Sequence, residues 1–355
     1  MRGSGRERLP LIDAMRTIAA AAVVFYHAEN LFCTNGLFRR GYLFVDLFFL
    51  ISGFVLTLSI EKNGRMSIDG LTFFKVRFRR FLPMTAIGLV NGALLMGGAS
   101  PVSMTIANIA LGLVMVPNLF SGGDIFPLNS VQWSLMQELL ANIAHGFVLK
   151  RMNDRQLAQL AGVLALLLIV SIAVLGENTG GPGVNNWWQG LPRGGFSYVA
   201  GMLLARRRLI APPGPVVSWQ LSLLAPVVII VLINQFPTAN WRGPVRVIGD
   251  IVTCLVLFPW CLWVASSAPV PARVGIWLRR AGRLSFPIYA VHLPIIRVLA
   301  PANEVMARTY PGHYAMLHAL ALVASFAAAS VIAIIQTVWA QRARRAVGQR
   351  VPQPS

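Results

Sequence analysis

Long apolar segments recur along the chain, separated by shorter stretches that hold most of the charged residues. The hydrocarbon core of a bilayer is about 30 Å thick, so a helix of about 20 apolar residues can cross it. Backbone polar groups inside a bilayer must be paired within the protein, which favours helices. The pattern therefore predicts an all-α, polytopic transmembrane helix bundle. Its candidate segments are 11–29, 42–60, 81–97, 103–118, 131–149, 157–175, 194–205, 216–233, 246–266, 284–300 and 315–339.

The basic residues indicate how these segments are oriented. Cytoplasmic loops are enriched in Lys and Arg, so all basic clusters should lie on one side, which requires residues 81–149 to cross an even number of times. We therefore expect 103–118 to be re-entrant or interfacial on the outer side. The result is about ten spans with both termini cytoplasmic, a membrane domain at 1–340 and a short basic cytoplasmic tail at 341–355. The clusters lie at 2–8, 62–80, 150–155, 206–208, 273–283 and 342–350.

Composition supports this interpretation and argues against nucleic-acid binding and against a disulfide or metal site. The 355 residues are 56% hydrophobic and 12% charged, and a soluble domain carries about twice that charged fraction. The net charge is +19, and the basic residues that produce it cluster between the apolar segments. We therefore expect contact with the lipid bilayer and none with nucleic acid. Cys33, Cys254 and Cys261 form no CxxC pair or zinc-type spacing, so we expect neither a disulfide nor a metal.

The first apolar segment carries ionisable residues on one helical face. Arg16 and His27 are eleven residues apart, which is about 20° from three whole turns and about 16 Å along the axis. Asp13 precedes Arg16 by three residues and shares its face. Charges inside a membrane are costly and usually functional, so this stripe predicts a site. The alternative is a basic flank followed by one histidine that is hydrogen-bonded in the core.

Other apolar segments contain polar residues of the same kind. Asp46 lies at about the depth of His27, and a nearby carboxylate can fix the tautomer of an imidazole. Ser52 precedes a glycine, which permits close approach of a ligand or, equally, of another helix. Glu138 needs a partner or must stay protonated. His292, in the tenth segment, is either functional or a core histidine held by hydrogen bonds.

Two arginines precede the third apolar segment. Arg77 and Arg80 are three residues apart, so they face the same way on a helix that enters the bilayer. Guanidinium groups match phosphate oxygens in charge and shape. The functional interpretation is a cytoplasmic phosphorylated ligand, and the alternative is a topology signal that binds anionic lipid.

Together these motifs resemble the membrane-bound acyltransferase-3 family of bacterial O-acyltransferases. They occur in the family's order and cover residues 9–300, most of the chain. The late motif includes Tyr289 as well as His292. The motifs are Asp13-x2-Arg16-x10-His27, Val45-Asp46-Leu47-Phe48-Phe49-x2-Ser52-Gly53-Phe54, Arg77-x2-Arg80-Phe81-x-Pro83, Trp133-Ser134-Leu135-x2-Glu138 and Gly282-x2-Ser285-Phe286-x2-Tyr289-x2-His292-x-Pro294.

The resemblance implies a multi-pass enzyme of the bacterial inner membrane. Such an enzyme moves an acyl group, most often acetyl, from acyl-CoA to a hydroxyl of a surface or exported polysaccharide or glycolipid. His27 would be the general base or would form an acyl-imidazole, and Asp46 or Glu138 would orient it. Arg16 and Asp13 would form an ion pair that stabilises developing negative charge. The donor, acyl-CoA, would be bound by Arg77 and Arg80, together with Ser52, Tyr289 and His292.

Two other functions remain open at this stage. The acceptor could be a small amphipathic molecule, because the sequence is silent on acceptor identity. A bundle with buried Arg, His, Asp and Glu could also be a proton-coupled transporter, although the chain shows none of the inverted repeats that many transporters contain.

Overall fold

The computed structural model is helical throughout the ranges that it describes. Within those ranges an isolated antiparallel bridge joins Asp124 to Gly183, and no strand forms. This confirms the all-α prediction. The described residues are 9–31, 38–61, 69–96, 100–212, 214, 217–235 and 243–309, with scattered helical residues between 319 and 335.

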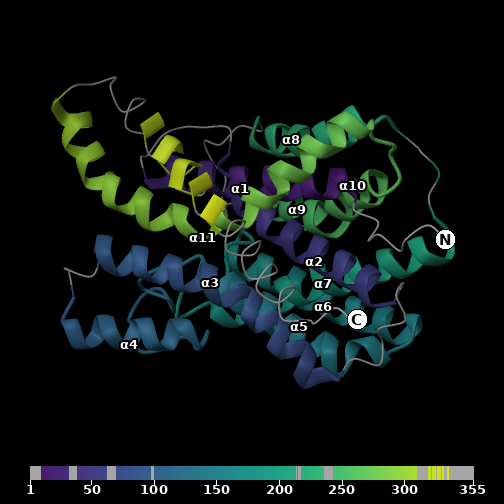
Figure 1. The fold of residues 1–355 in the computed structure, drawn as a ribbon, viewed down its shortest axis with the longest axis horizontal. Helices are drawn as coiled ribbons and strands as arrows, with labels where there is room; N and C mark the ends of the chain where they lie inside the picture. The colour runs from purple at the N-terminus through teal and green to yellow at the C-terminus, as the bar shows by residue number, and fades with distance from the viewer. Residues whose placement is uncertain are drawn as a thin grey trace, which may run out of the picture.

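The helices follow the predicted apolar segments closely (Figure 1). Short 3-10 turns precede α2 and α7, and a π-helical turn makes α9 and α10 one continuous helical stretch. The main helices are α1 (Pro10–Leu31), α2 (Phe44–Glu61), α3 (Gly70–Met96), α4 (Val102–Leu113), α5 (Gln132–Phe147), α6 (Asp154–Leu175), α7 (Gly190–Ile210), α8 (Trp219–Gln235), α9 (Pro244–Val252), α10 (Phe258–Ala265) and α11 (Ala272–Thr309).

The protein is a multi-pass membrane protein. Five helical stretches within the described ranges are long and apolar enough to cross a bilayer. Helix α4 has 12 residues and rises only about 18 Å, which is consistent with a non-crossing segment. The count of about ten spans and the cytoplasmic termini stay predictions. The expected last span, 315–339, is described only in part, and the tail at 341–355 lies outside the described residues.

Two helices begin earlier than the apolar pattern predicted. Helix α3 begins at Gly70 instead of near residue 81, because the Asp69 carboxylate accepts hydrogen bonds from the backbone N–H groups of Leu71 and Thr72 and so caps the helix. The basic stretch that contains Arg77 and Arg80 is therefore part of this helix. Helix α11 likewise begins at Ala272, twelve residues before the predicted span.

Two helix pairs, α1 with α11 and α2 with α7, have the most extensive contacts in the bundle (Figure 1). Small residues permit both approaches. A Cβ atom at Gly282 of α11 would lie 2.6 Å from the Asp13 Cβ atom, and a Cβ atom at Gly53 of α2 would lie 2.0 Å from the Tyr198 carbonyl oxygen. The Ser52-Gly53 step is therefore a site of close helix packing, as one interpretation of the sequence held.

Candidate active site

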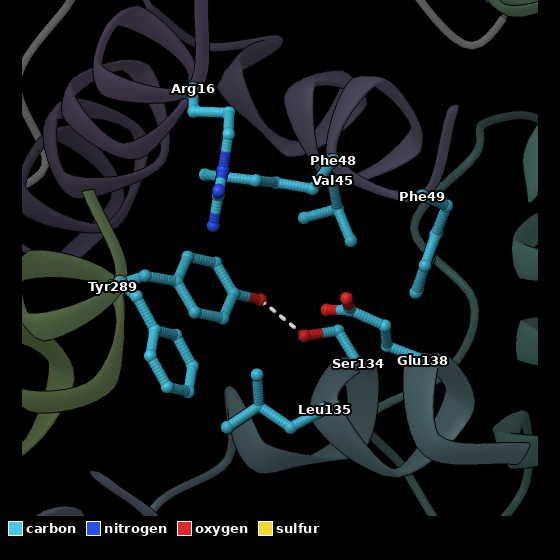
Figure 2. Close-up of a pocket in the computed structure, with 9 residues that line it drawn as sticks. Arg16, Val45, Phe48, Phe49, Ser134, Leu135, Glu138 and Tyr289 are labelled. Carbon is cyan, nitrogen blue, oxygen red and sulfur yellow. Dashed lines mark hydrogen bonds between the residues drawn. The ribbon is translucent and has the colours of Figure 1, made fainter. Parts of the chain in front are cut away.

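A cavity lies among α1, α2, α5 and α11, nearer the N-terminal end of α1 than His27 is. The empty space there, counted together with the open solvent at its mouth, is about 360 Å³. Aromatic and aliphatic side chains make up most of its wall, and a few polar groups face it (Figure 2), which is the usual composition of a small-molecule site. The lining residues are Arg16, Val45, Phe48, Phe49, Ser134, Leu135, Glu138, Phe286 and Tyr289.

Arg16 supplies the cationic group of this cavity. Figure 2 shows its side chain reaching from α1 toward the hydroxyl groups of Tyr289 and Ser134. The two hydroxyl oxygens are 2.6 Å apart. The Ser134 hydroxyl donates to the Val131 carbonyl at 3.0 Å, so Tyr289 donates to Ser134. Two of the predicted residues, Arg16 and Tyr289, therefore meet at one cavity.

Glu138 has the partner that its position in the membrane demanded. Its Oε1 atom accepts a 2.6 Å hydrogen bond from the Ser52 hydroxyl and lies 3.9 Å from a guanidinium nitrogen of Arg77. Arg77 is thus turned toward a carboxylate, whereas Arg80, one turn further along α3, is exposed. The two arginines that the sequence grouped together have different surroundings.

Asp13 and Arg80 complete the charges around Arg16. Both interact with the Arg16 guanidinium through space, as does Glu138. Asp13 also packs against α11 at Gly282. Asp13 and Arg16 of α1 and Arg80 of α3 therefore lie near one another at the cavity.

His27 contacts a second histidine, not a carboxylate. Its Nδ1 atom is 3.0 Å from Nε2 of His292 on α11. The ring of Tyr289, which lines the cavity, has its centroid 5.9 Å from that of His292, so Tyr289 connects the cavity with the histidine pair. Among the described residues, His292 is the side chain hydrogen-bonded to His27, while Asp46 contacts Arg193 and Glu138 contacts Ser52, so these contacts do not support the prediction that Asp46 or Glu138 orients His27.

Asp46 belongs to a buried ion pair at the N-terminal end of α2. Its Oδ2 atom accepts hydrogen bonds from Nε of Arg193 at 3.0 Å and from Nδ2 of Asn178 at 3.1 Å. Arg193 also donates to the carbonyl oxygens of Tyr42 at 2.6 Å and Gly180 at 3.0 Å. Both charged side chains are almost completely buried, at 1% and 2% exposure. Asp46 therefore joins α2 to α7 and to the loop before it.

A second buried carboxylate extends this arrangement. Asp250 of α9 accepts hydrogen bonds from the Tyr42 hydroxyl at 2.7 Å and from the Asn178 backbone N–H at 2.9 Å, and it lies 3.4 Å from Arg40. We call Arg40, Tyr42, Asp46, Asn178, Arg193 and Asp250 the outer charge network, because they lie at the end of the bundle that the sequence predicts to face outward.

Several of these residues were not predicted from the sequence. Arg193 has a signal there, because an arginine before an apolar segment on the predicted outer side departs from the positive-inside distribution. Ser134 is part of a motif, but the sequence assigned it no role. Asp250 lies inside an apolar segment, so the cost of burying a carboxylate in a membrane marks it as it marks Asp46 and Glu138. Within the described ranges, no cluster of three His, Cys, Asp or Glu side chains could hold a metal ion.

Comparison with known proteins adds independent evidence. The model of the acyltransferase domain family matches residues 9–336. "Protein 2 in picA locus" of Rhizobium radiobacter is 31% identical over 49% of this chain and 99% of its own length.

Two further relatives have names that state an activity. The peptidoglycan O-acetyltransferase OatA of Listeria monocytogenes is 25% identical over 84% of this chain and 51% of its own length. The O-acetyltransferase OatA of Staphylococcus aureus (strain NCTC 8325 / PS 47) is 27% identical over 48% of this chain and 31% of its own length. The chain thus spans about half or less of these two relatives. No solved structure matches the chain.

Proposed function

Because this chain belongs to the acyltransferase domain family, and is therefore an acyltransferase embedded in a membrane, we propose a specific reaction for it. It transfers an acetyl group from acetyl-CoA to a hydroxyl of a surface or exported polysaccharide or glycolipid, in the bacterial inner membrane. One observation carries the proposal: two contacting helices hold a cavity with Arg16 and Tyr289 and, further out, the pair His27 and His292.

The donor enters from the cytoplasmic side. Arg80 is exposed there, where a guanidinium can bind the phosphates of CoA. Arg77 holds Glu138 at the cavity wall. The thioester end occupies the cavity, whose largely aromatic and aliphatic wall can surround a short acyl group. Acetyl is therefore the proposed group.

Two residues of α1, Arg16 and His27, take part in the reaction. The acceptor oxygen attacks the thioester carbonyl, the C–S bond breaks, and the hydroxyl proton passes through the base to the leaving CoA thiolate. His27 is the base, or it first takes the acyl group as an acyl-imidazole. Arg16 faces the cavity and stabilises the negative charge that develops on the carbonyl oxygen.

The distance between these groups sets a requirement on the donor. Arg16 and His27 are about 16 Å apart along α1, and His27 is not among the residues that line the cavity. The thioester carbonyl must therefore react between these two residues, beside the rings of Phe48 and Tyr289, whose centroids are 5.4 Å apart, where the Arg16 guanidinium and the His27 imidazole can both reach it.

The acceptor assignment is supported by the relatives. The Listeria protein is named a peptidoglycan O-acetyltransferase, so a hydroxyl of a cell-envelope glycan is the proposed acceptor class.

The test is product formation in proteoliposomes that contain the purified protein. Labelled acetyl-CoA is supplied on one side and a panel of glycan fragments on the other. We expect an acetyl ester on a glycan, and loss of the same mass from surface glycans of cells that lack the gene. A matched preparation of the His27→Ala variant is the control.

Three outcomes would contradict parts of the proposal. Ester formation only on small amphipathic acceptors would replace the glycan. Uptake of label without ester formation would favour a proton-coupled transporter. Full activity of the His27→Ala variant would remove His27 from the reaction.

A further inference from the structure

His292 is buried in α11 and has a defined partner on each ring nitrogen. Its Nδ1 atom lies 2.9 Å from the Tyr289 carbonyl oxygen and 3.2 Å from that of Ile288. Its Nε2 atom lies 3.0 Å from Nδ1 of His27. The His27 Nδ1 atom lies a further 3.0 Å from the carbonyl oxygen of Val23. Both histidines thus have their Nδ1 atoms against backbone carbonyls.

These contacts determine where the ring hydrogens are. A carbonyl oxygen only accepts hydrogen bonds, so Nδ1 of His292 carries a hydrogen, and its Nε2 accepts when the ring is neutral. The carbonyl of Val23 imposes the same arrangement on His27, whose Nδ1–H then donates to Nε2 of His292. The reverse arrangement would leave Val23 facing a nitrogen lone pair. His27 is therefore held with an unprotonated Nε2.

From this geometry we infer that His292 is the positioning residue of His27, a role that rests on the proposed function. Together with the Val23 carbonyl, His292 fixes the tautomer whose Nε2 can accept a proton or attack a thioester, a task for which many enzymes use a carboxylate. Asp46 and Glu138 are bound to Arg193 and Arg77. When His27 Nε2 gains a proton or an acyl group, its Nδ1–H bond to His292 becomes charge-assisted and stronger, so the contact favours the transition state.

The first test uses two amide side chains of different length. A glutamine oxygen at position 292 can reach the place of the histidine Nε2, whereas asparagine, one methylene shorter, reaches only the place of Nδ1. We expect His292→Asn to lower kcat at least about tenfold, as part of the roughly 10²- to 10⁴-fold effect of a positioned base. His292→Gln should retain at least about tenfold more kcat than His292→Asn, and KM for acetyl-CoA should stay the same in both.

The kinetic result can overturn the inference directly. Equal kcat in the two variants, or an effect confined to KM, would show that the Nε2 acceptor is unimportant. The double variant His27→Ala/His292→Asn should be no slower than His27→Ala, because both changes act through one imidazole. A further loss in the double variant would assign His292 a separate role.

The second test does not require an active variant. The chain has five histidines, so solid-state NMR of ¹⁵N-histidine-labelled protein in liposomes gives few signals, and a His27→Gln sample identifies those of His27. We expect His27 to carry its hydrogen on Nδ1, and a hydrogen on Nε2 would overturn the inference. If His27→Ala were fully active, the proposed function would fail while this measurement still decided the tautomer.

Discussion

The chain buries charged side chains in two regions, the outer charge network and the cavity. The surroundings of the charges differ, and the difference distinguishes a structural role from a chemical one. In the outer charge network, Asp46 and Arg193 are almost completely buried and hydrogen-bonded to each other and to neighbouring groups. Around the cavity, Arg16 faces empty volume, and Glu138 is bound by one hydroxyl and by a guanidinium at 3.9 Å. A buried charge that is paired with another side chain holds helices together, whereas a charge that faces a cavity is available to a ligand.

This comparison explains why intramembrane ionisable residues predict a site imperfectly. The cost of burying a charge requires a partner, and that partner can be another side chain as well as a substrate. In the sequence, Asp46 and Glu138 are both carboxylates inside apolar segments. In the structure, Asp46 belongs to the outer charge network and Glu138 to the cavity wall.

The largest expected effect comes from removing the imidazole of the reaction centre. We predict that His27→Ala abolishes acetyl transfer, because a positioned base typically raises the reaction rate by about 10²- to 10⁴-fold. The amount of protein in the membrane should not change. Esterified glycan is measured per amount of folded protein, and wild-type rates in this variant would contradict the assignment.

The next effect tests the cavity cation. We predict that Arg16→Met lowers kcat by about 10²- to 10³-fold, the usual loss when a group that stabilises a developing oxyanion is removed. Arg16→Lys, which keeps the charge but loses the planar fork, should recover part of the rate. Steady-state kinetics with saturating acetyl-CoA distinguishes the variants, and an unchanged kcat in Arg16→Met would exclude this role.

The outer charge network should respond in stability. We predict that Arg193→Met destabilises the fold by about 3–5 kcal/mol, because it leaves Asp46 buried without its cation. Asp46→Leu/Arg193→Met should regain much of the loss. The measurement is the thermal unfolding midpoint in detergent, with kcat per folded molecule as the control. A stable Arg193→Met protein with a lowered kcat would place the network in the chemistry after all.

The smallest effect concerns donor binding at the cytoplasmic side. We predict that Arg80→Gln raises KM for acetyl-CoA about tenfold, the factor expected for one lost charged hydrogen bond, without changing KM for the acceptor. Arg79→Gln is the matched control, because Arg79 is the adjacent exposed arginine on α3. Equal effects of the two variants would indicate general attraction between CoA and a basic surface.

The features that could be predicted from the sequence are those set by interactions between residues close together in the chain. The apolar segments gave the helices because lipid permits few other backbone arrangements, and helical periodicity placed Asp13, Arg16 and His27 on one side of α1. Where α3 begins depended on Asp69, whose capping bonds extend a helix into a basic stretch.

The partners of the polar residues could not be predicted, since contacts between helices far apart in sequence depend on how the bundle packs. His292 is 265 residues from His27 and Arg193 is 147 residues from Asp46. No spacing rule connects such pairs. Sequence therefore identified His27, Arg16 and Glu138 as candidates, and packing decided what each of them contacts.

Pro294 of α11 has a consequence that extends beyond its own helix. Proline has no N–H group, so the carbonyl four residues earlier, at Ala290, lacks its helical donor. Nδ2 of Asn129 donates to that oxygen at 2.8 Å, beside Gly88 of α3, where a Cβ atom would not fit. The missing helical hydrogen bond thus leaves the Ala290 carbonyl to bind the segment that leads into α5. An alanine at position 294 would restore the helical bond within α11, and its N–H would compete with Asn129 for that carbonyl.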